Sequence, residues 1–113
     1  MSGQTTAKEL VLLHGEIKTP PLSQAARRES GRLLRQVQNG IALTMPHSRP
    51  MPGIGPRCHE LRINDEKQTW RVIYRIDENF IVVAHIFSKK TQQTPQTVID
   101  SCKKRYQEYD RRT

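Results

Sequence analysis

Five basic residues in the second half of the chain have the types and spacing to hold phosphate: Arg62, Arg71, Arg75, Lys89 and Lys90. Arg71 and Arg75 are four residues apart in an alternating segment, which places both on one face of a predicted strand. An arginine fork donates two parallel hydrogen bonds to a phosphate, and fixed cations stabilise charge that develops on phosphoryl oxygens. These residues therefore point to a phosphate-bearing ligand.

Ion pairing within the sheet is the alternative for these arginines. The carboxylates close enough in sequence are Glu60, Asp65, Glu66, Asp77 and Glu78. Pairing is favoured for Arg75, which lies two residues before Asp77. For Arg71 ligand binding is favoured, because a strand buries an unpaired charge only at great cost.

Histidine is the side chain whose ordinary pKa lies near neutrality, and the chain has four: His14, His47, His59 and His85. His59, on the same predicted strand as Arg62, is the candidate general acid or base for phosphodiester cleavage. His85 alternates with Val83 and Phe87 and is expected in the core. The sequence has no Walker loop, HExxH, GxSxG or CxxC motif, so neither a metal site nor a cofactor is expected.

The elements that must position these residues are visible in the hydrophobic pattern. Strands are predicted over 10–13, 57–63, 69–77 and 80–87, with a Pro-rich loop over 44–57. Ser23 is expected to cap one helix that ends near Asn39-Gly40, and Thr94 to cap a last helix with Pro95 in its first position. This order predicts an α+β domain with a mainly antiparallel four-stranded sheet, an N-terminal helix and a C-terminal helix packed on it.

Short connections force the last three strands to be neighbours, so their cations should converge on one surface. In TWRVIYRID, Trp70, Val72 and Tyr74 share one face, and Arg71 and Arg75 the other. The segment 80–87 is the most apolar and is expected at the centre of the sheet, covered on both sides. Cys58 and Cys102 are expected to be small core residues.

The 113 residues fit one domain over 1–113, with 1–7 expected to be disordered. With 19 Lys and Arg against 11 Asp and Glu, the net charge is +8, which favours nucleic acid as a partner and an acidic protein second. A charge that serves only solubility is the alternative. No apolar run is long enough for a membrane span, and no signal pattern is present, so a cytoplasmic location is expected.

Three motifs carry a resemblance: CHELRI, WRVIYRID and FSKKTQQTP, in this order. The chain resembles the RelE/HigB superfamily of bacterial toxins, and within it the phage-derived HigB-like branch. The resemblance implies a RelE-like sheet with helices on one side, and the toxin of a type II toxin-antitoxin system. It also implies a metal-independent endoribonuclease that cleaves mRNA on the ribosome and is neutralised by a helix-turn-helix-type antitoxin.

The resemblance also assigns roles. Arg62 matches a residue that contacts the substrate, and Arg71 the arginine at the scissile phosphate. Lys89 and Lys90 match the basic position that stabilises the pentacoordinate phosphate. Glu60 stands where RelE-type members have lysine, and Thr91 to Thr94 stand where some have tyrosine or histidine, which leaves His59 as the candidate acid or base. Arg57, Arg75 and Glu60 are predicted to be further RNA contacts.

Two other functions remain open from the sequence. One is a non-catalytic RNA- or ribosome-binding module of the same fold from a phage or mobile element. The other is a protein-interaction domain.

Overall fold

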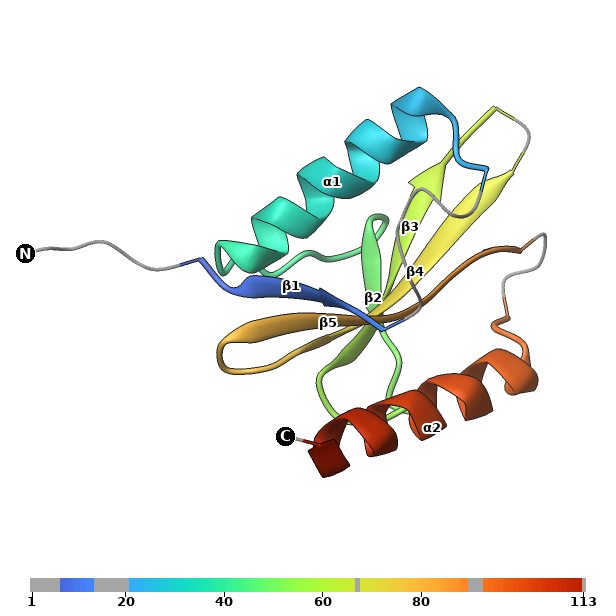
Figure 1. The fold of residues 1–113 in the computed structure, drawn as a ribbon. Coiled ribbons are helices and arrows are strands. Elements are labelled where there is room, and N and C mark those ends of the chain that lie inside the picture. The colour runs from blue at the N-terminus through green and yellow to red at the C-terminus, as the bar shows by residue number, and fades with distance from the viewer. Residues whose placement is uncertain (1–6, 14–20, 67, 90–92, 113) are drawn as a thin grey trace, which may run out of the picture.

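The computed structural model describes residues 7–13, 21–66, 68–89 and 93–112, with only the backbone of Lys89. They form an α+β fold with two helices and one sheet (Figure 1). The elements are β1 (Glu9–Leu12), α1 (Gln24–Gln38), β2 (Ser48–Pro50), β3 (Cys58–Asn64), β4 (Thr69–Ile76), β5 (Phe80–Lys89) and α2 (Gln96–Arg112). His14 and most of the segment predicted to be disordered lie outside the described residues.

The sheet has five strands in the order β1-β5-β4-β3-β2 and is mixed, which corrects the four-stranded prediction. The meander β3-β4-β5 is antiparallel as predicted, and β1 pairs in parallel with β5. The additional strand, β2, lies within the predicted loop 44–57 and pairs with β3. Proline is tolerated there because β2 is an edge strand, and Pro50 is its last residue.

The helices cover opposite faces of the sheet, not one side as the resemblance implied (Figure 1). On one face α1 packs through Leu33 and Leu34 against the predicted row that includes Trp70, Val72 and Tyr74. The other face has its own apolar cluster, in which Cys102 and Tyr106 of α2 pack with Cys58, Ile73, Val82 and Ala84. Two helices are needed because β5 has buried apolar residues on both faces, which confirms that β5 is covered on both sides. The middle strand of the sheet is β4, however, and not β5 as predicted.

The predicted cap of α1 is confirmed. The Ser23 hydroxyl accepts a hydrogen bond from the Ala26 amide at 3.0 Å, and Gly40 follows the helix end with a φ of 89°. At the start of α2, the Pro95 carbonyl accepts from the amides of Val98 and Ile99. The Thr94 hydroxyl donates instead to Glu60, which ties the beginning of α2 to the sheet.

The two cysteines are buried and free, as predicted for core residues. Burial raises the pKa of Cys58 to about 11 and that of Cys102 to about 12, so both thiols are protonated at neutral pH.

Candidate phosphate-binding site

The strand register brings Arg62 and Arg71 together on the face that α2 covers. The two residues are direct partners across β3 and β4, and Phe87 is the next partner on β5. Arg49 of β2 is the partner of Glu60, two residues before Arg62. Basic side chains from three adjacent strands therefore share one region, with Arg49 in addition to the predicted pair.

Arg71 is a buried cation with unused hydrogen-bond donors. Its exposed fraction is 5%, and its Nε and Nη1 atoms have no hydrogen-bond partner among the described residues. The nearest carboxylate is Glu60, whose Oε1 atom lies 3.9 Å from Nη1. Burial, together with the positive charges of Arg62 and Arg49, lowers the pKa of Arg71 despite the opposing effect of Glu60. Because leaving such donors unsatisfied is costly, the guanidinium is suited to receive an anion.

A polar pocket of about 290 Å³ lies against these two arginines. We call it the basic pocket; it is lined by Pro46, His47, Arg62, Asn64, Thr69 and Arg71. The backbone amide of Arg62 donates to the His47 carbonyl at 2.8 Å, which fixes the loop before β2 beside the pocket. The basic pocket thus combines two guanidinium groups with an imidazole.

Glu60 lies next to Arg71 of the basic pocket and has no exposed surface. Its Oε1 atom accepts from Arg49 Nε at 3.2 Å, and its Oε2 atom accepts from the Thr94 hydroxyl at 2.5 Å. It was predicted to be an RNA contact, but a carboxylate without exposed surface holds other residues in place instead. It joins β2, β3 and the start of α2.

Arg75 shares the face of Arg71 but lies at the other end of β4, where it is used in ion pairs. Its guanidinium donates to Asp77 at 2.8 Å from two nitrogens and to Asp110 at 2.8 and 3.1 Å, and it lies 4.7 Å from the centre of the Tyr106 ring. Burial opposes the charged form, but the hydrogen bonds to the two carboxylates outweigh it and raise the pKa of Arg75. The favoured pairing with Asp77 is confirmed, and Arg75 is not part of the basic pocket.

Arg57 lies beside Arg75 and away from the basic pocket. Its Nε atom donates to the Ile76 carbonyl at 3.0 Å, and its Nη2 atom lies 3.3 Å from Asp77. The structure therefore places both predicted RNA contacts, Arg57 and Arg75, in a cluster that ties α2 and β4 together.

His59 lies on the opposite face of the sheet from Arg62 and Arg71. Side chains alternate along β3, and the His59 ring stacks on Tyr74 with 5.3 Å between ring centres. Burial lowers the pKa of His59. The histidine that does lie beside the two arginines is His47, which sequence reasoning left unassigned in a loop.

Of the two predicted lysines, only the backbone of Lys89 is described. Lys89 is the last residue of β5 and the backbone partner of Thr69, which lines the basic pocket. The Lys89 side chain and all of Lys90 lie outside the described residues.

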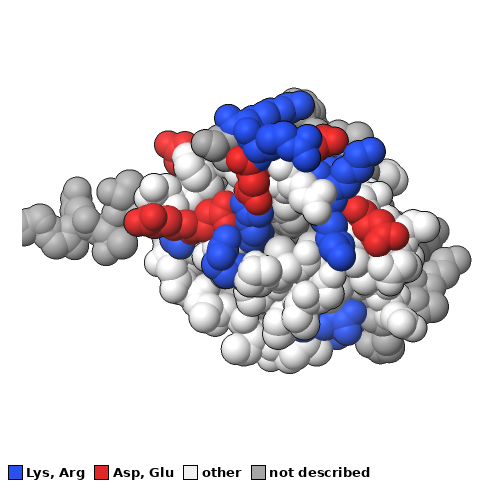
Figure 2. Space-filling model, turned by 90° about the horizontal axis from the view of Figure 1, so that it is seen from below, with Lys and Arg blue, Asp and Glu red and all other residues white. Residues whose placement is uncertain are grey.

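Figure 2 looks at the molecule from the side of α2 and shows how charge is distributed there. Basic side chains stand beside acidic ones, around a broad area of uncharged residues. The excess of positive charge does not form one continuous patch on this side.

Among the described residues, no group of three or more His, Cys, Asp or Glu side chains could hold a metal ion. None of the helices in this part of the chain is long and apolar enough to cross a membrane.

The model of the family described as phage derived protein Gp49-like (DUF891) matches residues 20–107. The chain belongs to this family, which is one of the RelE/HigB-like toxin families. A comparison with curated proteins finds no match. The superfamily resemblance is thereby confirmed, and the HigB branch stays a prediction.

Proposed function

We propose that the protein is the toxin of a type II toxin-antitoxin system and acts as a metal-independent endoribonuclease on mRNA. The observation that carries the proposal is Arg71, a buried guanidinium with unused donors beside Arg62 at a polar pocket. The Gp49-like family supports the toxin class. The HigB-like branch, action on the ribosome and a cytoplasmic location belong to the same proposal.

The reaction would use the substrate's own 2′-hydroxyl as the nucleophile. Its oxygen bonds to the adjacent phosphorus while the bond from phosphorus to the 5′-oxygen breaks, which leaves a 2′,3′-cyclic phosphate and a 5′-hydroxyl. Arg71 and Arg62 would stabilise the negative charge on the pentacoordinate phosphate. One proton leaves the 2′-oxygen and one is gained by the 5′-oxygen, and His47 is the pocket residue able to carry one of them.

A helix-turn-helix-type antitoxin remains the proposed partner. The basic pocket must be open to RNA, so a neutralising protein would cover it or place a carboxylate against Arg71. A carboxylate there would occupy the same donors that the scissile phosphate needs.

The test is expression of the chain without an antitoxin, followed by primer extension on cellular mRNA. Growth arrest and new mRNA 5′ ends are expected for the native chain, and both should be lost in Arg71→Ala. The matched control is Arg28→Ala, an exposed arginine on α1 that should leave both unchanged. Normal growth with intact mRNA at high expression would refute the nuclease.

A non-catalytic RNA- or ribosome-binding module is the second candidate. The observation that favours it is the position of His59 on the opposite face, which leaves the basic pocket with one histidine. In that case Arg71→Ala would weaken RNA binding, and the native chain would produce no cleavage.

A further inference from the structure

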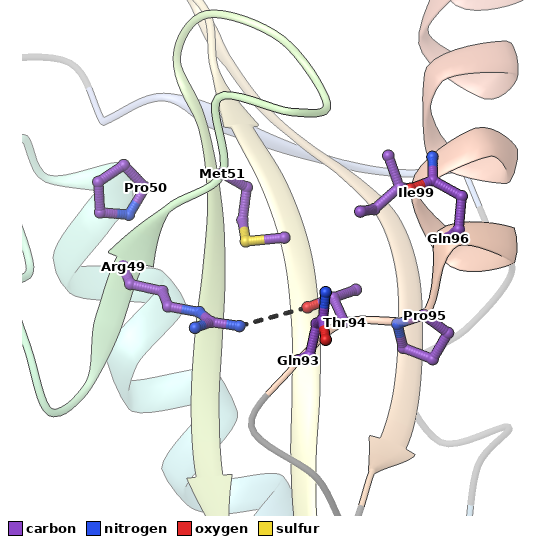
Figure 3. Close-up of a pocket in the computed structure, with 8 residues that line it drawn as sticks. All are labelled: Arg49, Pro50, Met51, Gln93, Thr94, Pro95, Gln96 and Ile99. Atoms are coloured by element: carbon purple, nitrogen blue, oxygen red, sulfur yellow. Dashed lines mark hydrogen bonds between the residues drawn. The ribbon is translucent and has the colours of Figure 1, made fainter.

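We propose that a second, larger pocket binds a nucleobase of the RNA strand whose phosphate lies at the basic pocket. This inference rests on the proposed function and adds a base-binding subsite to it. The pocket measures about 740 Å³ and lies between β2 and the start of α2 (Figure 3). We call it the base pocket; its lining includes Arg49, Pro50, Met51, Thr94, Gln96 and Ile99.

The lining has the chemistry that a flat heteroaromatic ring requires. Met51 and Ile99 extend toward the same space from opposite sides, and both offer apolar surface to the faces of a base (Figure 3). Gln96 lies at the rim of the pocket, where its Nε2 atom donates to Asp100 at 2.9 Å. Its amide oxygen accepts no hydrogen bond from a described residue, so it can accept one from the amino group of a base.

The base pocket and the basic pocket have no lining residue in common, but the buried carboxylate of Glu60 connects them. Arg49 and Thr94 line the base pocket, and both are hydrogen-bonded to the buried carboxylate of Glu60. The same carboxylate lies 3.9 Å from Arg71, which lines the basic pocket. Because Glu60 lies 3.2 Å from Arg49 and 3.9 Å from Arg71, we place a nucleotide next to the phosphate at Arg71 in the base pocket.

A base fits this place better than an acidic protein segment does. The volume lies within the range of small-ligand sites, and the lining is mostly apolar. Arg49, the one cation among its described lining residues, is already paired with Glu60. A carboxylate-rich segment would gain little there, whereas stacking a base on apolar surface requires no free charge.

The test uses 2′-O-methyl RNA oligonucleotides, which the proposed reaction cannot cleave, with one abasic residue moved through the sequence. Affinity is measured by fluorescence anisotropy at low salt. For the native chain, the abasic residue at one position should weaken binding roughly tenfold, as expected for the loss of one stacked base. Gln96→Ala and Ile99→Trp, which fills the pocket, should remove most of that difference. Gln107→Ala, an exposed glutamine of the same helix outside the pocket, should retain it.

Arg71→Ala separates this inference from the proposed function. It should weaken binding of all oligonucleotides by a similar factor and leave the ratio between intact and abasic RNA unchanged. The base pocket is refuted if no abasic position matters to the native chain, or if folded Ile99→Trp and Gln96→Ala keep the full ratio. If Ile99→Trp does not fold, Gln96→Ala decides alone. A native chain that shows the ratio but never cleaves mRNA would refute the nuclease and support the pocket.

Discussion

Arg62 and Arg71 are direct partners across β3 and β4, so two like charges face each other in the sheet. Like charges in this position destabilise a strand pair. Arg71 is buried, and the closest carboxylate to its guanidinium is 3.9 Å away. The fold therefore holds a buried cation with unused donors that a bound anion would satisfy, which is typical of a binding site and costs stability.

Replacement of Arg71 by methionine should reduce activity without loss of stability. The change removes a buried charge with unused donors, and Glu60 keeps its hydrogen bonds from Arg49 and Thr94, so the free energy of unfolding should change by less than about 1 kcal/mol. The cleavage rate should fall by roughly 10²–10³-fold, because one stabilising cation is lost. Urea unfolding and primer extension measure the two effects.

Arg75→Met provides the contrast, because Arg75 is an arginine of the same strand with both carboxylate partners in place. It should lower the free energy of unfolding by roughly 1–3 kcal/mol. If Arg71→Met destabilises the protein as much as Arg75→Met, then Arg71 holds the fold together and the phosphate-binding interpretation fails.

The stability of the protein should fall in acid partly through Asp77. Burial opposes its ionisation, but hydrogen bonds from Arg75 and Arg57 outweigh burial and lower the pKa of Asp77. A carboxyl group with a lowered folded-state pKa contributes stability above its unfolded value of about 3.9, and loses it as the pH falls through the folded value. Urea midpoints at pH 7, 5 and 3 should drop most between 5 and 3. The drop should be smaller in Asp77→Asn, and an equal drop in the variant would contradict this assignment.

Two glycines should respond in opposite ways to alanine. Gly31 lies inside α1, and an added Cβ at this position meets nothing within 4 Å, so Gly31→Ala should stabilise the protein by roughly 0.5–1 kcal/mol. Gly40 has equally open surroundings but a φ of 89° just after the helix. Gly40→Ala should therefore destabilise the protein by about 1 kcal/mol. Thermal unfolding compares the two, and a gain for both would mean that the backbone at Gly40 relaxes freely.

His47 and His59 should differ sharply in their effect on cleavage. His47 lines the basic pocket, whereas His59 stacks on Tyr74 on the other face. His47→Ala should lower the cleavage rate by roughly 10²–10⁴-fold and change its pH profile, as expected for a residue that transfers a proton. His59→Ala should affect stability and leave the pH profile of the remaining activity unchanged. The reverse result would show that His47 has no part in the chemistry.

Local patterns were sufficient for the elements with a regular repeat. The alternation of TWRVIYRID predicted the two faces of β4, and Ser23 and Gly40 marked the ends of α1. The strand β2 was missed because Pro50 and the prolines around the strand are typical of loops, and its pairing with β3 cannot be read from its own sequence. The parallel pairing of β1 with β5 joins segments about seventy residues apart, which no local pattern encodes.

The candidate site was only partly predictable for the same reason. Arg62 and Arg71 lie on neighbouring strands joined by a short connection. Their proximity could therefore be predicted from the order of the strands in the meander. Arg49, His47 and Thr94 come from segments whose position depends on β2 and on the fit of α2 against Glu60. The face of His59 could have been found by counting, because it lies an odd number of residues from Arg62 on one strand.

The edge of the sheet at β2 has no free amide to offer an incoming strand. The carbonyl of His47 and the amide of Met51 point toward β3, so the outward amides would be those of residues 48 and 50. The Ser48 amide already donates to the Thr44 carbonyl at 3.1 Å, and Pro50 has no N–H. An incoming strand therefore finds no backbone donor along this margin, which disfavours main-chain augmentation and edge-to-edge self-association. A protein that docks along β2 must therefore donate hydrogen bonds to its outward carbonyls or contact its side chains.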